Sequence, residues 1–279
     1  MPDFLRGLPL LAALFSAVPG MAADIPPADA TRPAAVQTPA QRAAATARDA
    51  LGVNVNAGLE ATLTSNAEEA PEGRFNSLVT PFVEAVLSRA LTSTLTGSAG
   101  VYASLSRYGR DPERYDGETL YPFLALYQAL RDFTLEAGYS HDYGFAPLLR
   151  RRELVERRAT LALQREWPLA EAWTVQSFLE LARLWEEEAG WWSLSPQAGL
   201  LWEVNDSLYI TMEAGVSLER QDAGEAVAAA WAAGGLDYAL TGKLSLGLTM
   251  LAFREQPLET GDGFSMVSAT PRLAVTWQF

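Results

Sequence analysis

The stretch that decides the fold is SLYITMEAGVSLE, residues 207–219. Apolar and polar side chains alternate through it, so that every second residue from Leu208 to Leu218 is apolar. Because successive side chains of a β-strand point to opposite faces, this period of two predicts a strand with one apolar and one polar face. The segment is also longer than the average globular strand of about five or six residues.

The same alternation recurs along most of the chain. It is equally clean at 53–64 and 267–279. Looser versions fall at 77–88, 94–108, 118–131, 133–144, 154–167, 172–185, 191–204, 225–240 and 243–254. Counted together with 207–219, these segments are twelve candidate strands.

The connectors between these segments alternate in length. Short ones fall near residues 90, 132, 169, 205–206 and 241–242, and longer, charged ones at 66–75, 109–117, 145–153, 186–190, 220–224 and 255–263. Short turns at one end and long loops at the other are typical of an up-and-down membrane barrel. We therefore predict an all-β fold, a transmembrane antiparallel barrel of about twelve strands over residues 52–279.

Aromatic residues favour a membrane barrel over a soluble β-sandwich. One group lies beside the short connectors or the C-terminus: Trp167, Trp173, Trp202, Tyr238 and Trp277. A second group lies near the long ones: Tyr139, Tyr143, Trp185, Trp191 and Trp192. Two such bands, a strand length apart, are expected at the two membrane interfaces.

The C-terminal strand supplies the most specific motif. Leu273, Val275, Trp277 and the terminal Phe279 are spaced by two. This pattern resembles the last strand of Gram-negative outer-membrane β-barrel proteins, a porin-like class. The resemblance implies that these four residues are a signal to the barrel-assembly machinery, and that the protein is an integral outer-membrane protein in contact with lipid and lipopolysaccharide.

Composition excludes several other classes of function. The absence of Cys excludes a disulfide scaffold, a zinc finger and a cysteine nucleophile. A single His cannot supply a poly-histidine metal site. With 34 acidic and 21 basic residues, a net charge of −13, the chain lacks the basic footprint of a nucleic-acid binder. We expect no cofactor and no metal.

The N-terminal region differs from the barrel segment. Residues 1–22 combine a weakly positive start, an apolar stretch and the small residues Gly20 and Ala22, a pattern that predicts a cleaved export signal peptide. Residues 23–51 are rich in Pro and Ala and predict a periplasmic tail, with a possible short helix after Pro39. Both chain ends are then expected in the periplasm.

The strand assignment is weakest between residues 149 and 188, which are rich in helix formers. Period two persists there, but it places Arg157 and Arg183 on the supposed lipid face. Near the loop ends these arginines can snorkel to the interface. At midplane each would cost about 2–4 kcal/mol, and a count of ten strands would then be expected.

The polar face carries the candidate functional residues. Its acids are Glu60, Glu84, Glu136, Glu180, Glu203, Glu213 and Asp237, with Arg158 and Arg272 as counter-charges. A surplus of negative charge in a narrow pore attracts cations. The leading expectation is a passive, cation-preferring channel for small solutes. A closed, salt-bridged interior, in a barrel that anchors or assembles an envelope or polysaccharide-export system, fits the same residues.

The run Ser140-His141-Asp142 raises the third possibility, an outer-membrane lipid hydrolase. Neighbouring strand residues point to opposite faces, so Ser140 and Asp142 should face the lumen and His141 the outside. A Ser-His-Asp triad needs its groups hydrogen-bonded in sequence, and we therefore expect no enzyme activity. Of the loop charges, Arg150, Arg151 and Arg152 are candidates for lipopolysaccharide phosphates, and the acidic loops, including residues 186–188, for divalent cations.

Overall fold

The computed structural model describes residues 51–66, 74–110, 116–146, 152–186, 189–222, 224–258 and 263–279. The predicted signal peptide, and all of the tail at 23–51 except Leu51, lie outside the described residues. In the described part of the chain, no helix is long and apolar enough to cross a membrane.

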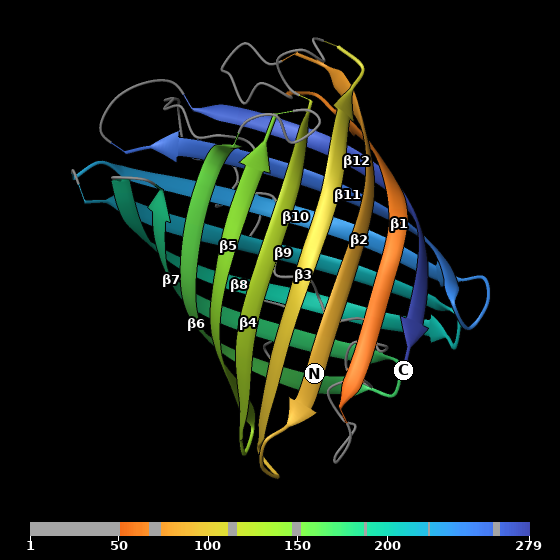
Figure 1. The fold of residues 1–279 in the computed structure, drawn as a ribbon. Helices are drawn as coiled ribbons and strands as arrows, with labels where there is room; N and C mark the ends of the chain where they lie inside the picture. Colours follow the sequence, from red (N-terminus) through yellow and green to blue (C-terminus); the bar gives the residue numbers. More distant parts are fainter. Residues whose placement is uncertain are drawn as a thin grey trace, which may run out of the picture.

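The chain folds into one closed antiparallel barrel of twelve strands (Figure 1). The strands are β1 (Gly52–Thr64), β2 (Asn76–Ala90), β3 (Leu95–Tyr108), β4 (Gly117–Leu130), β5 (Phe133–Phe145), β6 (Arg152–Ala170), β7 (Trp173–Glu186), β8 (Ala189–Asn205), β9 (Leu208–Gln221), β10 (Ala226–Ala239), β11 (Leu244–Pro257) and β12 (Phe264–Gln278). The predicted fold class is confirmed. The stretch 149–188, which is rich in residues of high helix propensity, contributes β6 and β7. The alternation of apolar and polar residues therefore outweighs helix propensity there.

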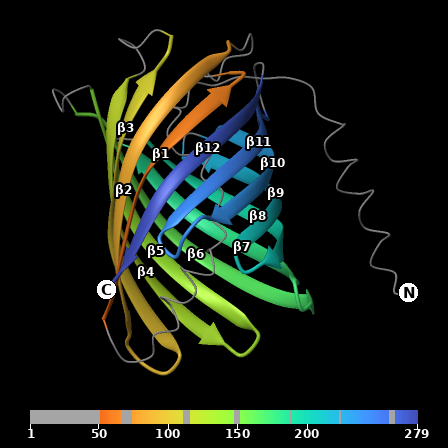
Figure 2. The ribbon, with the colours of Figure 1, turned by 90° about the vertical axis from the view of Figure 1, so that its right-hand side faces the viewer.

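The barrel closes where its first strand, β1, pairs with its last strand, β12 (Figure 2). β1 pairs with β12 from Asn54 opposite Gln278 to Thr64 opposite Ser268. Beyond this register, Val53 N donates to Phe279 O at 3.1 Å and Phe279 N donates to Val53 O at 2.9 Å. Both chain ends of the barrel therefore lie at the end that carries the short turns.

In the β2–β3, β8–β9 and β10–β11 turns, a Thr or Asn side chain accepts hydrogen bonds from backbone N–H groups of the turn. Thr92 Oγ1 accepts from Leu95 N at 3.0 Å, and Thr241 Oγ1 accepts from Leu244 N at 3.0 Å. Asn205 Oδ1 accepts from Ser207 N at 2.9 Å in the β8–β9 turn. These side-chain-to-backbone bonds close a turn without any long connection.

The alternation sorts side chains between the two faces of the barrel wall. Large apolar residues of one parity stay exposed on the outside, as Leu59 (46% exposed), Leu124 (58%) and Leu218 (54%) do. Residues of the other parity point inward. An apolar outer surface of this extent suits hydrocarbon rather than water.

The inward face is less uniformly polar than its sequence suggested. Trp231, Leu251, Phe253, Phe264 and Met266 form a buried cluster on β10, β11 and β12. Because β10 and β12 begin at the long-loop end, the cluster lies in that half of the interior. A smaller inward cluster on β7 and β8 joins Ala182, Leu184 and Trp191.

The predicted aromatic band near the long connectors is wrong for one residue, Trp191. Trp191 is 9% exposed and faces inward, whereas Trp192 is 51% exposed and faces outward. Consecutive residues of a strand cannot share a face, so the pair could contribute only one ring to an outer band.

The β1–β12 seam requires a small residue at Gly58. A Cβ there would clash with the carbonyl oxygen of Leu273 and lie 2.8 Å from the ring of Phe82. We expect Gly58→Ala to lower the free energy of unfolding by about 1–3 kcal/mol, because overpacking forces the neighbours to move. Tryptophan fluorescence during urea unfolding of the refolded barrel in detergent micelles measures this loss.

Gly234→Ala is the matched control, because a Cβ there meets only Thr211 O, at 4.0 Å. The control should unfold within about 0.5 kcal/mol of the parent. Equal losses at both glycines would contradict the steric account of the seam.

Candidate functional site in the barrel interior

One inward register row brings together four of the nine predicted interior charges. Glu203 lies opposite Tyr209, and Tyr209 lies opposite Asp237. The row continues from Asp237 through Gly247 to Arg272 and Glu60. Arg272 Nε lies 3.7 Å from Glu60 Oε1, so the row contains one ion pair.

A second group forms on β5, β6 and β7. Arg158 Nη2 donates to Glu180 Oε1 at 2.5 Å, and both side chains are largely buried. Glu180 and Glu136 lie opposite the same residue, Ala162, from either side. Arg158 therefore faces a group of carboxylates, and Glu180 holds it.

The remaining predicted charges stand apart. Glu84 lies opposite Tyr102 on β3 and forms no ion pair with a described residue. Glu213 lies opposite Gly199 and Ala233. In the first row, Glu203 differs from the other three charges, because it is exposed beside the β8–β9 turn, at the rim rather than deep inside the barrel.

The sequence reasoning missed further inward carboxylates. They are Glu156, Glu166, Glu186 and Glu255. Glu219 and Asp142, which strand parity predicts on the polar face, join them there. The connector lengths place Glu186 in a loop, although it shares the parity of Glu180. Extending each strand's parity to its last residue would have found it.

Charge is sorted by sign across the wall, among strand residues whose side chains the structure describes. The seven predicted and six further carboxylates make thirteen on the inward face, against Arg158 and Arg272. The outward face carries seven arginines: Arg89, Arg107, Arg157, Arg165, Arg183, Arg220 and Arg254. The outward-parity acid Glu118 accepts from Arg107 Nη2 at 3.1 Å.

The run Ser140-His141-Asp142 is split between the two faces. Tyr139 Oη lies 2.8 Å from His141 Nε2, and Tyr143 Oη lies 3.2 Å from His141 Nδ1. Ser140 Oγ instead accepts from Tyr121 Oη at 2.9 Å on the inward side. Both ring nitrogens of His141 are thus hydrogen-bonded to tyrosine hydroxyl groups, and Ser140 lies on the other side of the barrel wall.

No group of three or more His, Cys, Asp or Glu residues suited to a metal ion occurs among the described residues. Arg150 and Arg151 lie outside that part of the chain, as do residues 187 and 188.

The C-terminal motif lies on the outer face of β12. Leu273, Val275 and Trp277 sit opposite Leu59, Ala57 and Val55 of β1. Phe279 is 78% exposed beside the seam.

Comparison with known proteins identifies the fold. No protein-family model and no curated protein sequence matches the chain. Among solved structures, it is similar to the COG4313 outer membrane channel from Pseudomonas putida F1, with a TM-score of 0.53 and 15% identity over 82% of this chain and 96% of that one. The β-domain of the Bordetella autotransporter BrkA follows with a TM-score of 0.49 and 13% identity, covering 82% and 100%.

An anion-selective porin from Comamonas acidovorans has a TM-score of 0.44 and 10% identity, covering 82% of this chain and 99% of that one. At these identities the likeness concerns the fold alone. The chain has the fold of the outer-membrane β-barrel class.

The Arg158–Glu180 contact should stabilise the interior. We expect Arg158→Gln to cost about 1–3 kcal/mol of unfolding free energy, because it leaves Glu180 largely buried without its charged partner. Urea unfolding in micelles measures the loss.

The double variant Arg158→Gln/Glu180→Gln should recover much of that stability, since neither charge is then left alone. Strictly additive losses in this double-mutant cycle would show that the two groups do not interact.

Proposed function

We propose that the protein is a passive, cation-preferring channel for small solutes in the outer membrane of a Gram-negative bacterium. The observation that carries the proposal is the distribution of charge across the wall: among the strand residues whose side chains are described, thirteen inward carboxylates face two inward arginines. Such a lumen concentrates cations and repels anions, because low-dielectric walls focus the field of the fixed charges.

The two inward arginines do little to offset this surplus. Arg158 is bound to Glu180, and Arg272 lies beside Glu60. Each of these pairs is neutral as a unit. The carboxylates outside these pairs then set the sign of the potential, and Glu84 is one of them.

The proposed orientation places both chain ends and the short turns in the periplasm and the long loops outside. Outer-membrane barrels have short periplasmic turns and longer external loops. Outer-membrane lipid would surround the wall, and we propose that Leu273, Val275, Trp277 and Phe279 present β12 to the barrel-assembly machinery, as the resemblance of this motif implies.

A barrel that does not conduct is the second candidate. The buried inward cluster around Trp231 and Phe264 favours it, because apolar side chains of three adjacent strands pack together in the long-loop half of the interior. In that case the barrel would anchor or assemble an envelope or polysaccharide-export system. The separation of Ser140 from His141 gives no support to a lipid hydrolase.

Planar-bilayer recording of the refolded protein tests the proposal. We expect discrete conductance steps and, under a KCl gradient, a reversal potential of the sign that K⁺ selectivity produces. The absence of steps would favour the structural candidate. Anion preference would overturn the proposal.

Removal of inward charge gives a sharper prediction. Glu84→Gln/Glu203→Gln should lower the cation-to-anion permeability ratio by about twofold, because two carboxylates leave the lumen and its rim.

The control is Glu225→Gln, which removes an exposed carboxylate from the connector before β10. Its permeability ratio should stay closer to that of the parent. Equal effects of the interior and loop variants would locate the selectivity outside the lumen.

A further inference from the structure

The outward-facing arginines are unevenly distributed between the two ends of the barrel. Arg89 and Arg165 lie toward the short-turn end, whereas the other five lie toward the long-loop end. A guanidinium on the lipid face costs about 2–4 kcal/mol at midplane and about 0–1 kcal/mol near an interface. The five arginines toward the long-loop end therefore place positive charge at the membrane surface on that side.

Two neighbouring register rows join several of these residues into one surface. Arg183 of β7 lies opposite Trp192 of β8, which lies opposite Arg220 of β9. In the next row, Arg157 of β6 lies opposite Trp185 of β7. We call these five residues the β6–β9 arginine patch.

Arg183 contacts three side chains around the patch and fixes their positions. Its guanidinium donates to both carboxylate oxygens of Asp222, at 2.7 and 2.5 Å, and lies 5.6 and 5.2 Å from the ring centres of Trp185 and Trp192. The hydrogen bonds from Arg183 lower the pKa of Asp222, so the carboxylate stays ionised. The contacts hold two indole rings in place, and Trp192 remains half exposed.

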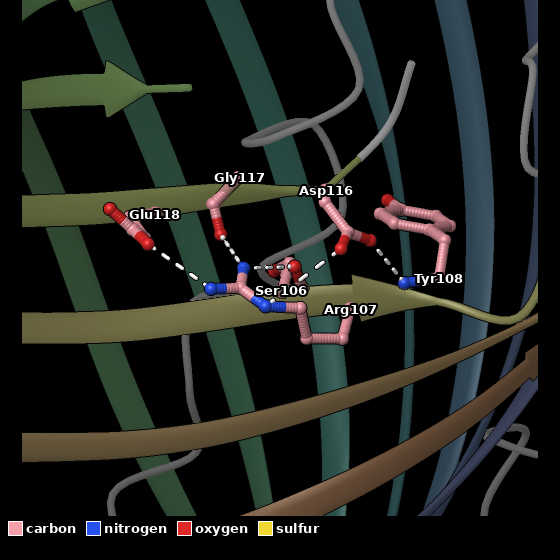
Figure 3. A network of polar contacts seen from close by, with 6 residues as sticks. All are labelled: Ser106, Arg107, Tyr108, Asp116, Gly117 and Glu118. Atoms are coloured by element: carbon pink, nitrogen blue, oxygen red, sulfur yellow. Dashed lines mark hydrogen bonds and ion pairs between the residues drawn. The ribbon is translucent and has the colours of Figure 1, made fainter. Parts of the chain in front are cut away.

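Arg157 and Arg220 differ from the other arginines at this end. Both are exposed, and neither forms an ion pair or hydrogen bond with any residue that the structure describes. Arg107 shows the contrast (Figure 3): it donates to Glu118 Oε1 and to the carbonyl oxygens of Ser106 and Gly117. The patch thus has two guanidinium groups available for an anion from outside the chain.

The spacing of these two groups defines the shape of a ligand. Arg157 and Arg220 stand three strands apart, about 14 Å across the strands at the usual spacing, and two residues apart along them. The exposed indole of Trp192 lies between them. Guanidinium binds phosphate in a bidentate manner, and an indole face packs against the apolar face of a sugar ring.

We propose that the β6–β9 arginine patch binds a lipid A-type glycolipid of the outer leaflet, with one phosphate at Arg157, the second at Arg220 and the sugars over Trp192. This rests on the proposed membrane location and orientation, but not on conductance. The acyl chains would lie along the apolar outer surface below the patch. The site is separate from the interior, because all its residues have outward parity.

Binding of purified lipid A to the full barrel in detergent micelles tests the proposal. We expect diphosphoryl lipid A to change the tryptophan fluorescence saturably, and monophosphoryl lipid A to bind more weakly. Phosphatidylglycerol and inorganic phosphate should not compete at the same concentration. Equal competition by phosphatidylglycerol would overturn the proposal in favour of a nonspecific basic interface, and competition by inorganic phosphate would reduce the site to one for the free anion.

A pair of double variants completes the test. Arg157→Gln/Arg220→Gln should bind diphosphoryl lipid A at least about tenfold more weakly, the effect expected from losing a hydrogen-bonded charge pair. Arg89→Gln/Arg165→Gln removes the same charge from the other end and should bind like the parent. Equal weakening in both variants, or in neither, would overturn the proposal.

Heat-modifiable migration on gels establishes that each variant is folded. A variant that fails to fold is replaced by Arg157→Lys/Arg220→Lys, which keeps the charge and removes the bidentate geometry. Binding that survives unchanged in the lysine variant would also contradict the proposed phosphate contacts.

Discussion

The rest of the structure depends on the closure of the backbone hydrogen-bond ring. In hydrocarbon, each unpaired N–H or C=O group costs several kcal/mol, so a sheet can cross a membrane only without a free edge. β1 and β12 provide the last join, and the mutual bonds between Val53 and Phe279 extend it to the chain end. The close contact of Gly58 with Phe82 and the backbone of β12 belongs to the same seam.

Closure of the barrel determines which environment each of the two faces of a strand meets. Once the sheet is a ring, one parity faces lipid and the other the interior along all twelve strands. The same alternation that places Leu218 outside places Glu219 inside. An interior rich in carboxylates and an outer surface with arginines near its ends are thus two results of one backbone arrangement.

The sequence allowed the fold to be predicted because its signal is local. Residues 207–219 alternate without interruption, and β9 occupies nearly the same range, Leu208–Gln221. Contacts between strands were less accessible. Arg158 reaches Glu180 although their strands pair them with Leu184 and Ala162, and no alternation within a single strand contains that offset.

The inward apolar cluster escaped prediction for a related reason. In β10 and β12, apolar residues occupy both parities near the long-loop end, so alternation within one strand does not show that Trp231 and Met266 belong to one inward apolar cluster. The pairing of Trp231 with Phe253, and of Phe253 with Met266, decides it. The number of strands can thus be predicted from alternation within the sequence, whereas the packing of the interior depends on contacts between strands.

The opposite signs of the two faces also bear on how the barrel is built. If β9 slipped by one residue during assembly, Glu213 and Glu219 would turn into the lipid while Leu218 turned into the interior. The cost of placing carboxylates in hydrocarbon and the loss of apolar contact with lipid would then both disfavour the misplaced strand. The distribution of charge between the two faces thus gives the wall a polarity from inside to outside, which selects the orientation of each strand together with its hydropathy.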